Sequence, residues 1–160
     1  MKKCCPLAEL RQRIRFIVIS AQEPDLGTVA TLAAQLWPDS TPAELVSEFQ
    51  QLLSQGQTQF FLKILDDQII GFAQCQLRHD YVEGTSTSPV GYLEGLFIYD
   101  QYRHQGYATE LLNACKAWAK SQGCTEFASD CAITNEASIR FHLNAGFTEA
   151  NRIVCFTSKL

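Results

Sequence analysis

Residues 91–108 read GYLEGLFIYDQYRHQGYA, and this stretch decides the fold. In its first half the side chains alternate between two faces that are both largely apolar, which predicts a strand covered on both sides. Its second half is a turn containing Gly106, which opens an amphipathic helix. Because the first backbone N–H groups of a helix have no partner within it, such a turn binds phosphate readily. The stretch therefore predicts a site for a phosphate-bearing cofactor.

Two adjacent residues of this strand depart from its apolar character. Glu94 places a carboxylate inside the segment, where it must be paired, neutralised or directed into a cleft. Gly95 follows it, and a glycine inside a strand suggests a bulge or the close approach of another group. The pair marks a candidate functional site within the same stretch.

Composition indicates a single folded domain. The chain has 160 residues, of which 46% are hydrophobic and 19% charged. Its formal net charge of −4 argues against nucleic-acid binding and is compatible with a cationic substrate. The apolar runs are too short to cross a bilayer and no secretory segment follows Lys2 and Lys3, so we expect a cytoplasmic protein without a membrane partner. Seven cysteines without a CxxC pair or a nearby histidine favour structural thiols, and we expect no metal.

The pattern along the chain predicts an α/β (α+β) mixed sheet, central and largely antiparallel, with helices on both faces. Besides the strand of the opening stretch, the expected strands are residues 16–20, 59–65, 68–77, 126–132 and 147–157. Helices are expected after Pro24, after the capping box of Thr41 and Glu44, from Tyr107, and after Asn135. Residues 78–89 form a long polar loop, either functional or merely solvated. Residues 1–15 are predicted to be an N-terminal extension of a domain spanning residues 16–160.

The turn carries Arg103, Gly106 and Ala108 in the spacing Arg-x-x-Gly-x-Ala, between an acidic strand and an amphipathic helix. This arrangement resembles the acetyl-CoA signature of the Gcn5-related N-acetyltransferase (GNAT) superfamily, and it implies that fold and acetyl-CoA as cosubstrate. The implied cofactor contacts are Leu96, Phe97 and Ile98 along the strand, Arg103, His104, Gln105, Gly106, Tyr107 and Ala108 around the pyrophosphate, and Asn135, which could also be a plain helix cap.

Two longer segments, YVEGTSTSPVGYLEG at residues 81–95 and CTEFASD at residues 124–130, resemble the aminoglycoside 6'-N-acetyltransferases. This resemblance implies acetyl transfer to the 6'-amine of aminoglycoside antibiotics, which confers resistance, by a homodimer. The implied substrate contacts are Trp37, Tyr81, Glu94, Asp130 and a fifth position, normally acidic, which is Asn151 here. Because aminoglycosides are polycations, we expect several carboxylates to converge, namely Asp80, Glu83, Glu94 and Asp130. Trp37 could instead be a core residue, and Asp130 an exposed strand end.

The reaction would be direct attack of the amine in a ternary complex. We expect Glu94 to take the proton from the substrate amine and Asp130 to position it, while a bulge at Gly95 frees a backbone N–H, that of Leu96, for the thioester oxygen. His142 stands where many relatives carry a tyrosine near the leaving sulfur, so it is either a general acid or a structural residue. The alternatives are a polyamine or another small amine as acceptor, a protein N-terminus, or a non-catalytic acetyl-CoA-binding module.

Overall fold

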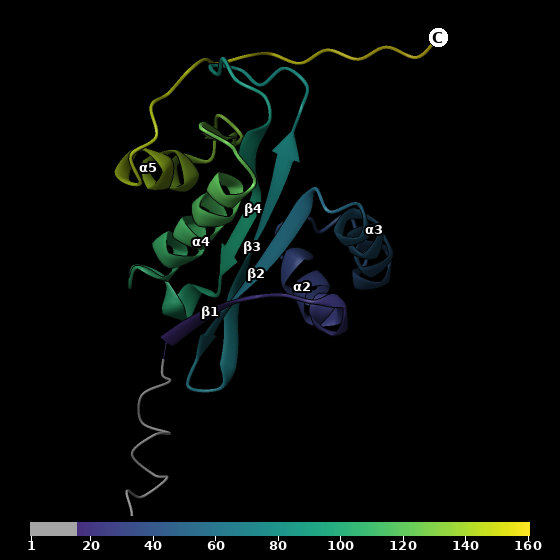
Figure 1. Cartoon of the computed structure of the whole chain (residues 1–160), viewed down its shortest axis with the longest axis vertical. Coiled ribbons are helices and arrows are strands. Elements are labelled where there is room, and N and C mark those ends of the chain that lie inside the picture. The colour runs from purple at the N-terminus through teal and green to yellow at the C-terminus, as the bar shows by residue number, and fades with distance from the viewer. Residues whose placement is uncertain (1–15) are drawn as a thin grey trace, which may run out of the picture.

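The structure, a computed structural model, describes residues 16–160. A five-stranded sheet in the order β1-β2-β3-β4-β5 runs through its centre (Figure 1). The strands are β1 (Phe16–Ser20), β2 (Thr58–Leu65), β3 (Gln68–Arg78), β4 (Val90–Ile98) and β5 (Phe127–Ser129). Neighbouring strands pair antiparallel except β4 and β5, which are parallel. The predicted mixed, largely antiparallel sheet is confirmed.

Helices cover both faces of this sheet, as predicted. They are α2 (Leu26–Ala33), α3 (Pro42–Ser54), α4 (Tyr107–Ser121) and α5 (Glu136–Asn144), with short 3-10 helices η1 (Glu23–Asp25) and η2 (Asp100–Tyr102). Figure 1 shows α2 and α3 on one side of the sheet and α4 and α5 on the other. The first pair packs on a core containing Phe49, Phe60 and Phe72, whereas α4 contributes Leu111 and Leu112 to a second core. No helix within residues 16–160 has the length and apolar character needed to span a membrane.

Local sequence signals account for two of the element boundaries. Thr41 accepts a hydrogen bond from the Glu44 backbone N–H at 3.3 Å, and the Glu44 carboxylate accepts one from the Thr41 N–H at 2.8 Å. This capping box begins α3, with Pro42 at its first position. Asp66 and Asp67 join β2 to β3 with positive φ angles of 46° and 66°, the conformation of a tight two-residue hairpin turn.

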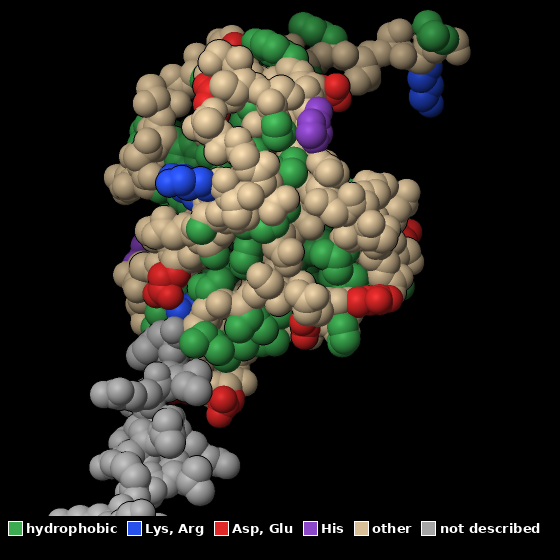
Figure 2. Space-filling view, in the orientation of Figure 1, with side chains coloured by type: hydrophobic (Ala, Val, Ile, Leu, Met, Phe, Trp, Pro, Cys, Tyr) green, Lys and Arg blue, Asp and Glu red, His purple; other side chains and the backbone are tan. Residues whose placement is uncertain are grey.

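The predicted last strand, residues 147–157, is wrong. This segment has no regular secondary structure, and its end projects away from the body of the molecule (Figures 1 and 2). The side chains of Ile153, Val154 and Phe156 are 70%, 78% and 89% exposed. A β-strand forms only when it is hydrogen-bonded to a neighbouring strand. The alternating apolar residues of this segment indicate β propensity, but they do not show which strand it would pair with. The strand expected at residues 126–132 is likewise shorter, because β5 ends at Ser129.

Candidate functional site

The bulge expected in the opening stretch is present in β4 at Glu94. Gln74 of β3 pairs with Gly95, but the next residue, Cys75, pairs with Leu93, so Glu94 is the extra residue of the bulge. Such an extra residue bends the strand and redirects its side chains. The Glu94 side chain lines a cavity on the α3 side of the sheet, and Gly95 faces Trp37 on that same side.

Trp37 closes over the bulge from the turn that follows α2. The helix ends at Ala33, earlier than its apolar spacing predicts, and the freed turn carries the indole onto the sheet. The indole packs edge-on against Phe49 and Phe72, with ring centroids 6.5 and 6.3 Å away. A Cβ at Gly95 would lie 2.8 Å from the Trp37 ring, so only glycine fits beneath the indole. Trp37 is therefore both a core residue and a wall of the cavity.

Gly95→Ala should displace the Trp37 ring. Because the added Cβ would also come within 3.3 Å of Leu36, we expect a loss of about 1–3 kcal/mol in the free energy of unfolding. Trp37 fluorescence, measured in a Trp118→Phe background, should shift. Gly27→Ala is the matched control, since its added Cβ would have no atom within 4 Å, and its stability should be unchanged or slightly higher. Unaltered emission and stability in Gly95→Ala would contradict this account of the bulge.

Glu94 is held by an arginine that the sequence did not single out. Arg78, at the end of β3, donates from Nε and Nη2 to the two carboxylate oxygens of Glu94 at 2.9 and 2.7 Å. Burial alone would lower the pKa of Arg78, yet the hydrogen bond and charge of Glu94 raise it above its ordinary value. Glu94 is therefore held in one orientation by a planar, two-pronged ion pair.

The same network reaches Asp130. The guanidinium carbon of Arg78 lies 3.4 Å from the ring centroid of Tyr92, whose hydroxyl donates to Asp130 Oδ1 at 2.6 Å. Burial and then the hydrogen bond to Asp130 raise the pKa of Tyr92 well above its ordinary value, so the phenol keeps the proton that it donates. The structure thus joins Glu94 and Asp130 through Arg78 and Tyr92, and neither linking residue was predicted.

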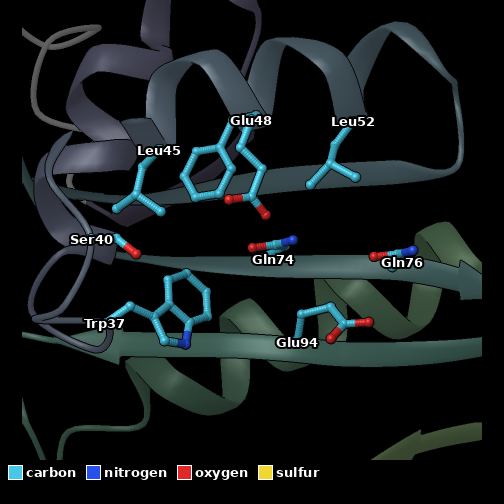
Figure 3. Close-up of a pocket in the computed structure, with 9 residues that line it drawn as sticks. Trp37, Ser40, Leu45, Glu48, Leu52, Gln74, Gln76 and Glu94 are labelled. Atoms are coloured by element: carbon cyan, nitrogen blue, oxygen red, sulfur yellow. The ribbon is translucent and has the colours of Figure 1, made fainter. Parts of the chain in front are cut away.

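A cavity of about 300 Å³ opens beside this network (Figure 3). Its lining consists of Trp37, Ser40, Leu45, Glu48, Phe49, Leu52, Gln74, Gln76 and Glu94. Of these, only Trp37 and Glu94 were predicted. The sequence contains a signal for two further lining residues, Gln74 and Gln76. Together with Arg78 they recur at every second position, and so on one face, of an otherwise apolar strand. Within residues 16–160 no group of His, Cys, Asp and Glu side chains could hold a metal ion.

The polar loop after β3 brings other predicted residues together. Tyr81 is 80% exposed and donates to Glu83 at 2.9 Å, and Asn151 donates to the other Glu83 oxygen at 3.3 Å. Glu126 fastens this loop by accepting from the Thr87 and Ser86 backbone N–H groups at 2.7 and 2.9 Å. Within residues 16–160, no hydrogen bond joins Tyr81 or Asn151 to Glu94 or Asp130.

One edge of β4 is open where the cofactor arm was predicted. The pairing with β5 ends at Leu93 and Ser129, so in the described chain the rest of β4 has no strand on that side. Of the three predicted backbone contacts, Leu96 and Phe97 lie on this open stretch, whereas the carbonyl of Ile98 accepts from Arg103 Nε at 3.0 Å. Arg103 also pairs with Asp100 at 2.9 Å, so its side chain braces its own turn.

The turn before α4 has the conformation of an anion site. His104 and Gly106 adopt positive φ angles of 61° and 87°, and Gly106 is the residue that caps the 15-residue helix α4. Backbone N–H groups in such a turn point outward and favour a bound anion. No atom lies within 4 Å of a Cβ built at Gly106, so its φ angle, rather than crowding, demands glycine. Near the start of α4, the buried Lys63 forms an ion pair with Glu110. The turn of residues 103–108 has a backbone conformation that fits a pyrophosphate.

Two further predicted residues belong to α5, Asn135 as its N-terminal cap and His142 within the helix. Asn135 caps this helix by accepting from the Ser138 N–H at 3.1 Å. His142 Nδ1 lies 2.7 Å from the Ser138 carbonyl oxygen, and because a carbonyl only accepts, Nδ1 must carry a hydrogen. Its Nε2 lies 3.0 Å from Ser129 Oγ, which is itself 3.2 Å from the Leu93 carbonyl oxygen. His142 therefore reaches the point where β4 and β5 separate.

Comparisons with known proteins agree with this geometry. The chain is 37% identical over 145 residues to an aminoglycoside N(6')-acetyltransferase type 1 from Serratia marcescens, which covers 90% of this chain and 99% of that protein. Its structure resembles that of AAC(6')-Iy in complex with the bisubstrate analog CoA-S-monomethyl-acetylneamine, with a TM-score of 0.86, 31% identity and coverage of 91% and 99%. It also resembles AAC(6')-Ih from Acinetobacter baumannii, with a TM-score of 0.84, 38% identity and coverage of 91% and 99%.

The sequence profile of one family spans the elements that build the site. It matches residues 26–147, which run from the first residue of α2 to just beyond α5. The match thus includes the turn that carries Trp37, the bulged strand β4 with its open edge, and the left-handed turn before α4. The chain belongs to the Acetyltransferase (GNAT) family.

Proposed function

We propose that this chain transfers the acetyl group of acetyl-CoA to the 6'-amine of aminoglycoside antibiotics and so confers resistance. The observation that carries the proposal is the junction of two sites along β4. At Glu94 the strand faces a cavity with carboxylates, and a few residues later it presents an open edge that leads to the anion turn before α4. The relatives named aminoglycoside 6'-N-acetyltransferases span nearly the whole chain, which supports the same acceptor.

The acceptor amine would be handled by Glu94 and Asp130. A carboxylate offers about four lone-pair positions, and Arg78 uses two of those on Glu94, so two stay available for a proton delivered directly or through water. Asp130 is held by Tyr92 and would orient the amine. Trp37 would contribute an apolar wall against a sugar ring, and Tyr81 and Asn151 would meet the far end of the acceptor.

Acetyl-CoA would supply an activated acetyl thioester. The backbone of Leu96 and Phe97 would pair with the pantetheine arm as an added strand does, and the turn of residues 103–108 would hold the pyrophosphate. Asn135 would add a hydrogen bond to the arm while it caps α5. The bulge supports a further role for the Leu96 backbone N–H, which would donate to the thioester oxygen.

His142→Gln should lower kcat by about tenfold or more if His142 is the proton source for the leaving thiolate. We propose that it acts at the separation of β4 and β5, where its Nε2 contacts Ser129. A purely structural histidine would lower Tm and leave kcat within about twofold of wild type, which would refute the proposed role.

The function is tested by measuring thiol release from acetyl-CoA with a panel of acceptors. We expect turnover with kanamycin-type and gentamicin-type aminoglycosides, with product mass and NMR placing the acetyl group on the 6'-nitrogen. Spermidine is the comparison for a polyamine enzyme, because an acidic cavity would attract it as well. Turnover of spermidine but of no aminoglycoside would overturn the proposed acceptor, and binding of acetyl-CoA without any turnover would favour the non-catalytic module.

We also propose that the enzyme is a homodimer. The support is the exposed apolar end of the chain around Ile153, Val154 and Phe156, which would be covered if it paired with a second copy. Light scattering should give twice the mass of 17.9 kDa, and a variant ending at Asn151 should give the monomer mass. A full-length monomer at micromolar concentration would refute this.

We also propose that the enzyme is located in the cytoplasm. It is supported by cysteine usage, since the five cysteines within residues 16–160 are free thiols. Three of them, Cys75, Cys115 and Cys124, are buried in the core. Recovery of the enzyme in the periplasmic fraction rather than with cytoplasmic markers would contradict it.

A further inference from the structure

The cavity contains a polar atom that the protein itself does not satisfy. Gln74 is 5% exposed, and its side-chain oxygen is buried without a hydrogen-bond donor anywhere in residues 16–160. Buried polar groups of this kind are uncommon because an unmade hydrogen bond is costly. Gln74 lines the cavity beside Glu94, so its amide is the group that a donor entering the cavity would meet.

A carboxylate faces this oxygen from α3. Figure 3 shows the Glu48 side chain extending from the helix toward the strand that carries Gln74. The other carboxylate of the cavity, Glu94, already has both oxygens bound by Arg78. Within the described chain Glu48 has no ion pair, so the uncompensated negative charge of the cavity lies on the α3 side.

We propose that Glu48 and Gln74 form a subsite for a second ammonium group of the acceptor, distinct from the amine that is acetylated. An ammonium beside an unpaired carboxylate keeps its proton, and a protonated amine cannot attack a thioester. The subsite therefore binds a group that does not react, and it selects acceptors with at least two positive charges. This inference rests on the proposed function, since it assigns the second contact of a polycationic acceptor.

The test uses kanamycin as the probe, with KM and kcat measured across a range of sodium chloride concentrations. Glu48→Gln should raise KM about tenfold, leave kcat within about twofold, and weaken the dependence of KM on salt. Glu23→Gln is the matched control, because it removes one exposed negative charge from η1, outside the cavity lining. It should leave KM and its salt dependence unchanged.

Gln74→Met separates this role from a structural one. The substitution keeps the length of the side chain and removes the unsatisfied oxygen, so Tm should rise by several degrees while KM for kanamycin rises about fivefold or more. If Gln74 served only the fold, the substitution would lower Tm and raise KM. KM within twofold of wild type in both Glu48→Gln and Gln74→Met would overturn the subsite. The proposed function would still stand if the wild type acetylates kanamycin. Absence of aminoglycoside turnover in the wild type would overturn both the proposed function and the subsite.

Discussion

Glu94→Gln is expected to lower kcat/KM for an aminoglycoside by roughly 100-fold or more, because general base catalysis contributes about that much. The substitution is close to isosteric and its amide oxygen can still accept a hydrogen bond from Arg78, so the fold should persist. What it loses is the ability to take a proton from the acceptor amine. Steady-state kinetics, with Tm measured in parallel, check both expectations.

Arg78→Gln is the control that divides the effect between the carboxylate and its ion pair. It leaves the Glu94 carboxylate in place but removes the two hydrogen bonds of 2.9 and 2.7 Å that orient it. If Glu94 is the base, Arg78→Gln should lower kcat/KM by less than Glu94→Gln does. A value of kcat/KM within about threefold of wild type in Glu94→Gln would show that the proton is taken by another group.

The part of the fold that depends on local chemistry could be predicted from the sequence. The capping box at Thr41, the turn at Asp66 and Asp67, and the left-handed glycine before α4 are each specified by a few neighbouring residues. The bulge at Glu94 was also predictable, because a carboxylate followed by a glycine in a buried strand disfavours regular pairing at that point. These signals place the strand, the turn and the carboxylate of the site.

What the sequence could not supply were contacts that depend on register between distant segments. Arg78 meets Glu94 because β3 and β4 pair with one residue extra in β4, and that offset has no signature in either strand alone. Tyr92 was expected only as a strand residue, and its hydroxyl finds Asp130 across a parallel pair of three residues. The strand predicted at residues 147–157 was wrong for the same reason, because alternating apolar residues do not show which strand the segment would pair with.

Asp130→Asn is the other substitution with a large expected effect. Asp130 is exposed just beyond β5, and the Tyr92 hydroxyl holds one of its oxygens at 2.6 Å, which leaves the other oxygen for the acceptor amine. A hydrogen bond to a charged group is worth about 1.5–3 kcal/mol, so kcat/KM should fall roughly tenfold to a hundredfold, with KM raised and kcat lowered together.

Tyr92→Phe distinguishes the charge of Asp130 from its orientation. The variant keeps the carboxylate and removes only the hydroxyl that holds it, so the acceptor should still bind and KM should change little. Its kcat should fall by less than in Asp130→Asn, because a freely rotating carboxylate still visits the productive orientation. An unchanged KM in Asp130→Asn would mean that the acceptor amine is held elsewhere. In that case the network that links Glu94, Arg78 and Tyr92 would serve to brace β4 against β5, and Glu94 alone would face the substrate.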